Sequence, residues 1–121
     1  MELQLSDEGR MVLDTLRRFL DDRVLPAERD HDAEATEIAV GEDTPTLKRL
    51  RREARDLGLW NLCLPDPDWG SGIGPLDYAL LCEAMGTSAI APRVFNCDAP
   101  DSGNADILLR YGSEAQREQW L

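Results

Sequence analysis

Residues 75–86 read Pro-Leu-Asp-Tyr-Ala-Leu-Leu-Cys-Glu-Ala-Met-Gly, and this stretch decides the fold class. It predicts a helix from about Pro75 to Met85, because proline suits the first turn of a helix and Gly86 suits the position after the last one. Apolar side chains surround nearly the whole circumference of this predicted helix. A helix of that kind is normally buried, so we expect it to lie in the middle of a helical protein.

A second predicted helix occupies the start of the chain. Ser6 is a good N-cap, and large apolar residues then recur at three- and four-residue spacing as far as Val24. Pro26 should end or kink this helix near Leu25. Residues 30–40 are acidic and only weakly periodic, so a frayed helix end followed by a loop is expected there.

The remaining helices are marked by capping signals. A helix beginning after Thr44 should end before Gly58, which is well placed as a left-handed residue. Residues 59–64 are interpreted as a short extended piece, and residues 65–75 as a loop. Further helices are expected over about 102–111 and from Ser113 onward, where Gln116 completes a capping-box spacing. The predicted fold is therefore all-α, a bundle of about five helices.

Length and charge restrict the function. The chain has 121 residues, which suits one domain with a real core. Its 13 basic and 24 acidic residues give a net charge of −11, which disfavours nucleic acid and anionic lipid as partners. The 3 cysteines (Cys63, Cys82 and Cys97) are most simply small buried hydrophobic residues, because their number is odd and no CxxC occurs. No zinc site is expected, since the chain has only 1 histidine.

No membrane segment or secretory signal is recognisable in the sequence. The richest apolar stretch, residues 76–85, is interrupted by Asp77 and Glu83, whereas a membrane span needs about 20 apolar residues. The N-terminus lacks the basic start and apolar run of a secretory signal. The default location is therefore the cytoplasm.

Several candidate sites have ordinary structural alternatives. Residues 70–74 (GSGIG) faintly resemble a phosphate-binding loop, but a tight connecting loop is favoured. The acidic residues Asp66, Asp68 and Asp77 have the spacing of a calcium loop without its glycine or final glutamate. His31 lies among acidic residues, and we expect it to be solvated.

The predicted helix over residues 45–57 carries five basic residues. They are Lys48, Arg49, Arg51, Arg52 and Arg55. A solvated face paired with acidic neighbours is the favoured interpretation, and a docking face for an acidic partner is the alternative. Residues 95–104 are a further candidate, because an irregular run of small and polar residues between two helices often lines a ligand pocket, although a plain connection is also possible.

Three segments of the chain carry motifs whose order and spacing are informative. They are residues 58–65 (GLWNLCLP), residues 69–86 (WGSGIGPLDYALLCEAMG) and residues 111–121 (YGSEAQREQWL). Their order and spacing resemble the N-terminal helical domain of the FAD-dependent acyl-CoA dehydrogenases. Residues 95–104 (FNCDAPDSGN) are similar to the branch that acts on long or unusual acyl chains. The resemblance covers residues 6–121, and we expect residues 1–121 to form one such domain.

The resemblance implies a complete protein that oxidises the Cα–Cβ bond of an acyl-CoA thioester. In the family a glutamate base takes a proton, FAD accepts hydride, and an electron-transfer flavoprotein receives the electrons from a homo-oligomeric enzyme. The base and most of the flavin site belong to a β-domain and a C-terminal helical bundle that have no counterpart in this chain. We therefore expect a chain truncated before the β-domain, with no catalytic residue, no FAD bound to it alone and no activity in isolation.

What carries over to this chain is one wall of the acyl pocket. The substrate-binding residues implied by the resemblance are Phe95, Asn96, Cys97, Ala99, Pro100 and Gly103. Small groups at Ala99 and Gly103 would leave room for a long or bulky acyl chain. The alternative is a stand-alone helical protein-interaction module without catalytic activity, which would dock through its basic helix.

Overall fold

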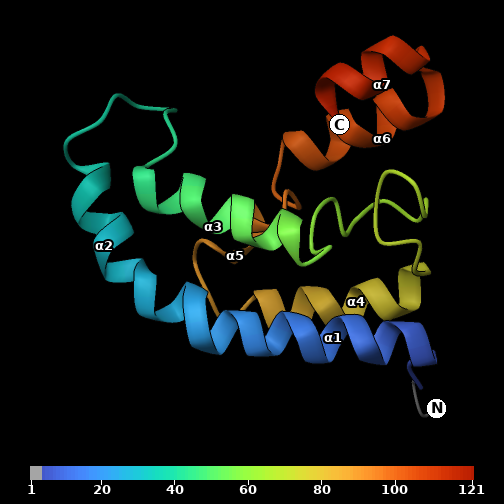
Figure 1. Cartoon of the computed structure of the whole chain (residues 1–121), viewed down its shortest axis with the longest axis horizontal. Coiled ribbons are helices and arrows are strands. Elements are labelled where there is room, and N and C mark those ends of the chain that lie inside the picture. The colour runs from blue at the N-terminus through green and yellow to red at the C-terminus, as the bar shows by residue number, and fades with distance from the viewer. Residues whose placement is uncertain (1–3) are drawn as a thin grey trace.

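The computed structural model describes residues 4–121, and this part of the chain contains helices and loops but no strand (Figure 1). Its elements are α1 (Asp7–Phe19), the π-helical turn η1 (Leu20–Val24), α2 (Leu25–Ala35), α3 (Pro45–Asp56), α4 (Pro75–Met85), α5 (Ala91–Val94), α6 (Asp101–Tyr111) and α7 (Glu114–Trp120). The all-α prediction is confirmed. Within this part of the chain, no helix is both long and apolar enough to span a bilayer.

The first two helices run into each other through η1. Ser6 caps α1, and its hydroxyl accepts a hydrogen bond from the backbone N–H of Gly9 at 2.9 Å. The irregularity expected at Pro26 takes the form of η1, after which Pro26 occupies the first turn of α2, where its missing N–H has little effect. The helix then continues to Ala35, so the first part of the acidic segment is well-formed helix and not a frayed end.

Helices α1 and α4 pack against each other, as Figure 1 shows. At one end of this contact, the carboxylate of Asp77 accepts hydrogen bonds from the backbone N–H and the hydroxyl of Ser6, at 3.0 and 2.5 Å. A Cβ atom at Gly9 would collide with the same carboxylate. The glycine therefore allows the close approach of the two helices.

The bounds predicted for α4 are confirmed, but its expected central position is wrong within residues 4–121. Leu81 and Met85 are buried, whereas Leu76 is 47% exposed and Cys82 is exposed as well. The reason is that α4 packs mainly against α1 and α5, on one side. Its other apolar face remains on the surface.

The core is shared by α1, η1, α3, α5 and one face of α4. Its largest fully buried apolar side chains include Leu16, Val24, Leu47, Leu50, Leu81, Val94 and Phe95. The ring of Phe95 packs edge-on against Phe19, with centroids 5.9 Å apart and planes at 63°. The start predicted for α3 is confirmed, since the Thr44 hydroxyl accepts from the N–H of Leu47 at 3.0 Å.

The long connection between α3 and α4 consists of turns. Gly58 has the left-handed backbone expected after α3, with a φ of 72°. Residues 59–64, expected to be extended, form turns instead, and Asn61 has a φ of 52°. These turns bury Leu59, Leu62 and Leu64, which the sequence alone showed only as an apolar run.

The helical hairpin of α6 and α7 stands apart from the other helices in Figure 1. Ser113 and Gln116 form the predicted capping box at the start of α7. The carbonyl oxygen of Leu121 accepts hydrogen bonds from Trp60 Nε1 and from Asn61 Nδ2, each at 3.2 Å. These contacts connect the end of the hairpin to the turns that follow α3.

Candidate functional site

The segment expected to line a pocket follows α5 and leads into α6. Phe95 is fully buried, so its side chain belongs to the core. Cys97 is half-buried and packs against that core. Ala99 and Pro100 are exposed, as is Gly103 in the first turn of α6. The segment is therefore anchored at its first residues and presents small residues on the surface.

A chain of polar contacts holds Asn96. Its φ of 56° is left-handed, and its amide donates a hydrogen bond to Asn61 Oδ1 at 2.6 Å. The guanidinium of Arg51 donates to Asn96 Oδ1 at 3.3 Å and also pairs with Asp43. Asp43 in turn pairs with Arg93 at 3.0 Å. The backbone of the candidate segment is thus fixed by contacts with α3 and with the turns after it.

A hollow of about 700 Å³ lies between α3 and the hairpin of α6 and α7. Arg51, Arg55 and Trp60 line one side of it. The guanidinium carbon atoms of Arg55 and Arg51 lie 3.8 and 5.1 Å from the ring centroid of Trp60. Of the six predicted pocket residues, only Asn96 lines this hollow.

Sequence reasoning did not predict that the basic helix and Trp60 would share this site with Asn96. The only signal available was the four-residue spacing of Arg51 and Arg55, which places both on one helix face. Their meeting with Trp60 depends on the turns after α3, which carry no periodic pattern.

Three thiols and one phenol converge beside the candidate segment. The hydrogen bond with Cys97 lowers the pKa of Cys63, and the same contact raises the pKa of Cys97. Burial raises the pKa of Tyr78, whose hydroxyl lies beside Cys97 and Cys82. The expectation of three buried cysteines is wrong for Cys82, which is exposed on the free face of α4, and holds only in part for Cys63 and Cys97, which are half-buried.

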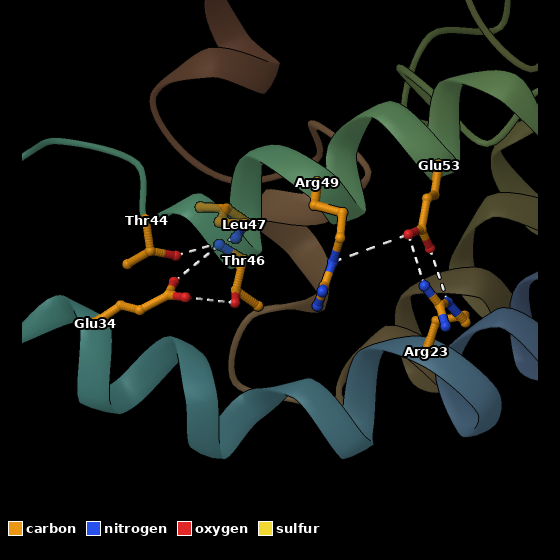
Figure 2. Close-up of polar contacts among 7 residues, drawn as sticks. All are labelled: Arg23, Glu34, Thr44, Thr46, Leu47, Arg49 and Glu53. Atoms are coloured by element: carbon orange, nitrogen blue, oxygen red, sulfur yellow. Dashed lines mark hydrogen bonds and ion pairs between the residues drawn. The ribbon is translucent and has the colours of Figure 1, made fainter.

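The prediction for His31 is wrong. Its side chain is buried, and its Nδ1 atom lies 2.7 Å from the hydroxyl oxygen of Thr44. One turn further along α2, Glu34 accepts hydrogen bonds from the backbone N–H and the hydroxyl of Thr46, at 2.8 and 2.9 Å (Figure 2). The N–H of Thr46 is the main cause that lowers the pKa of Glu34. These residues attach α2 to the start of α3.

The glycine loop of residues 70–74 and the aspartate motif that begins at Asp66 both make contacts within their own loop. A Cβ atom at Gly70 would collide with the carbonyl oxygen of Leu64, so this glycine packs against the chain and does not face a phosphate. Asp66 Oδ1 accepts hydrogen bonds from the N–H groups of Asp68 and Trp69, as in an Asx turn. Among residues 4–121, no group of three or more His, Cys, Asp or Glu side chains is placed to hold a metal ion.

Comparison with known proteins decides the family. Residues 6–121 match the family model described as acyl-CoA dehydrogenase, N-terminal domain. The chain belongs to the acyl-CoA dehydrogenase family. This confirms the resemblance inferred from residues 58–65, 69–86 and 111–121.

Individual acyl-CoA dehydrogenase relatives agree with this assignment. The chain is 39% identical to mouse acyl-CoA dehydrogenase family member 10 over 97% of its length, and 41% identical to the human family member 11 over 94%. It is 42% identical over its full length to "Probable acyl-CoA dehydrogenase FadE2" of Mycobacterium tuberculosis. A solved structure titled "Structure of a putative acyl-CoA dehydrogenase from Mycobacterium abscessus" superposes with a TM-score of 0.80 at 42% identity over 98% of the chain.

These relatives are much longer than this chain. The chain spans 11% of the mouse protein, 15% of the human protein and 30% of the M. tuberculosis protein. It spans 31% of the solved M. abscessus chain.

Proposed function

We propose that this chain is the N-terminal helical domain of a flavin-dependent acyl-CoA dehydrogenase and forms one wall of its acyl pocket. The residues proposed for the wall are Phe95, Asn96, Cys97, Ala99, Pro100 and Gly103. The observation that carries the proposal is an exposed surface of small residues on a firmly anchored segment, in a chain whose residues 6–121 match this family's N-terminal domain.

The geometry of the segment supports this role. Phe95 anchors one end in the core, and the contacts of Asn96 with Asn61 and Arg51 hold the backbone just before the exposed residues. Apart from its chain neighbours and the backbone of α6, no atom lies within 4 Å of the position that a Cβ at Gly103 would take. A fixed backbone with open space beside it can set the length of an apolar chain that lies along it.

The glycine loop of residues 70–74 does not fit the pyrophosphate of FAD. The loop of residues 70–74 is closed against its own backbone at Gly70, and Gly72 packs against Pro67. Neither glycine is available to approach a pyrophosphate closely, which a dinucleotide loop requires. No step of the reaction is therefore assigned to residues of this chain.

The wider activity is proposed for the complete protein. It comprises FAD-dependent oxidation of the Cα–Cβ bond of an acyl-CoA thioester, transfer of electrons to an electron-transfer flavoprotein, and a homo-oligomeric state. A role in fatty acid metabolism and a cytoplasmic location are proposed on the same basis. The isolated chain is expected to be inactive, and Glu83, exposed near the end of α4, is given no catalytic role.

The pocket proposal is tested by Ala99→Trp in an enzyme that contains all domains. An indole at this exposed position should shorten the longest acyl-CoA that is oxidised, because it fills space along the proposed wall. The measurement is kcat/KM across a series of saturated acyl-CoA chain lengths. Ala33→Trp, on the exposed side of α2, is the matched control and should leave the profile unchanged. An unchanged profile in Ala99→Trp would refute the role of this wall.

The enzyme assignment is tested by purification from the natural locus, with a flavin absorption spectrum and an intact mass from one sample. Bound flavin together with a longer chain or a second polypeptide is the expected result. A colourless 13.5 kDa protein without any partner would contradict it.

A further inference from the structure

A second groove, on the outer side of α3, is lined mainly by cations. It has a volume of about 660 Å³. Its lining residues are Asp43, Pro45, Lys48, Arg51, Arg52 and Arg55. This local positive charge belongs to a chain whose net charge is −11.

The carboxylates near α3 neutralise only some of its cations. Glu53 is held by Arg23 at 2.7 Å and by Arg49 at 4.0 Å, on the side of α3 that faces η1, as Figure 2 shows. Asp43 pairs with Arg51 and with Arg93. The interpretation of a solvated, paired face therefore holds for these arginines.

It does not hold for the cations of the groove. Within residues 4–121, Lys48, Arg52 and Arg55 have no carboxylate within 4.0 Å. The guanidinium of Arg55 is held instead over the ring of Trp60, beside the like charge of Arg51. Burial and the charge of Arg51 lower the pKa of Arg55, as expected for a cation that lacks a counter-charge.

We propose that this groove binds a short aspartate- and glutamate-rich segment of a partner protein. Positions 48, 52 and 55 span about 10 Å along the helix, so their charges form a row and do not converge on one point. A row of cations suits successive carboxylates along an acidic segment better than it suits a single phosphate. Asp43 shows how a carboxylate is accommodated at the edge of the groove, where it pairs with Arg51.

The overall charge of the chain argues against other polyanions. A net charge of −11 repels nucleic acid and anionic membranes over long distances, whereas a short peptide segment can reach the local cations. The test can be kept separate from the acyl-CoA chemistry, because Lys48 and Arg52 line this groove and not the hollow beside Asn96, whereas Arg51 bonds to Asn96 and is left unchanged.

The test uses the full 121-residue chain and a fluorescein-labelled glutamate-rich peptide, with a glutamine-rich peptide of the same length as reference. Fluorescence anisotropy at low salt should show binding of the glutamate peptide only, and this binding should weaken as salt is added. The double variant Lys48→Glu/Arg52→Glu should weaken binding about tenfold or more. Both side chains are exposed, so the fold should be retained, as circular dichroism can verify.

The matched control is Arg10→Glu/Arg29→Glu, which changes the net charge equally at exposed positions of α1 and α2. Unchanged binding in this control supports the groove, and equal loss in both double variants would overturn it. Two further results would also overturn the proposal. One is that inorganic pyrophosphate displaces the peptide when both supply the same concentration of negative charge, which would indicate a site for a small anion. The other is that the wild-type chain self-associates and the groove variant does not, which would make a second copy the occupant.

Discussion

Asn61 and Asn96 are the two non-glycine residues of the described chain with left-handed backbones. Asparagine tolerates this conformation better than most residues, because its short amide can hydrogen-bond to nearby groups. The two side chains bond to each other, and Asn61 also donates to the carbonyl oxygens of Trp69 and Leu121. Two distant segments are thereby joined by a contact that neither segment predicts alone.

The substitution Asn61→Ala should lower the free energy of unfolding by about 2–4 kcal/mol, because it removes buried hydrogen bonds and puts alanine, which lacks the asparagine amide, in a left-handed conformation. Asn61→Gly should be less destabilising by about 1 kcal/mol, since glycine adopts this backbone freely. Urea unfolding followed by circular dichroism measures both values. An equal loss of unfolding free energy in the two variants would mean that the left-handed backbone at this position does not affect stability.

Glu34 should make the stability of the chain dependent on pH. Its pKa in the folded protein is lowered from 4.5 by the N–H of Thr46. The stabilisation is therefore fully present above the unfolded pKa and is lost as the pH falls through the lower, folded pKa. Glu34→Gln should flatten the decline of the urea midpoint below about pH 5.

The control for this prediction is Glu37→Gln. The Glu37 side chain is exposed and has no hydrogen-bond partner among residues 4–121. Its substitution should leave the acid branch of the stability curve as it is in the wild type. If both variants flatten that branch alike, a general charge effect and not the Glu34 contact is responsible.

At the scale of elements, α3 is positioned by its first residues. The hydroxyl of Thr44 caps α3 and also lies against the buried His31 of α2, while Glu34 bonds to Thr46 one turn away. The sequence predicted the cap, because a capping signal is local. It did not predict the burial of His31, because that burial depends on where the loop of residues 36–44 places the start of α3 relative to α2.

Thr44→Val should destabilise the fold by about 2–3 kcal/mol, since it removes the cap of α3 and leaves the buried His31 Nδ1 without its partner. Thr44→Ser retains the hydroxyl and should cost less than about 1 kcal/mol. Thermal and urea unfolding of the two variants give the comparison. A serine variant as unstable as the valine variant would show that the methyl group, not the hydroxyl, matters here.

At the scale of the whole molecule, much apolar surface is left uncovered in the described chain. Leu76 on α4 and Ile107, Tyr111 and Trp120 on the hairpin of α6 and α7 are 47%, 58%, 82% and 66% exposed. Apolar surface of this extent is normally found at contacts with other protein. A contact of this kind on the free face of α4 would account for the apolar residues there, which led to the prediction of a central helix.

This surface should cause the isolated chain to self-associate at high concentration. Ile107→Glu/Tyr111→Glu should raise the concentration needed for association about tenfold or more, because it puts charges on the exposed apolar side of α6. Sedimentation velocity over a concentration series is the measurement. Ala33→Glu/Ala115→Glu, at two exposed alanines, is the control. A wild-type chain that stays monomeric throughout would contradict the prediction.

The family itself could be read from the sequence, because its pattern is carried by the order of residues 58–65, 69–86 and 111–121. The candidate pocket could be placed only as a segment, residues 95–104. Which of its residues face the core and which face solvent follows from the left-handed turn at Asn96, and turns of this kind have no periodic signature.

The sequence by itself determined where several helices begin, as at Ser6, Thr44, Pro75 and Ser113, because caps and prolines act within one turn of the backbone. It also determined the all-α class, through apolar periodicity. Only the tertiary structure decided which groups from distant segments meet: Asn61 with Asn96, Cys63 with Cys97, and Arg55 with Trp60. These contacts depend on the direction in which irregular turns lead the chain. The spacing of residues within one segment does not specify such long-range packing.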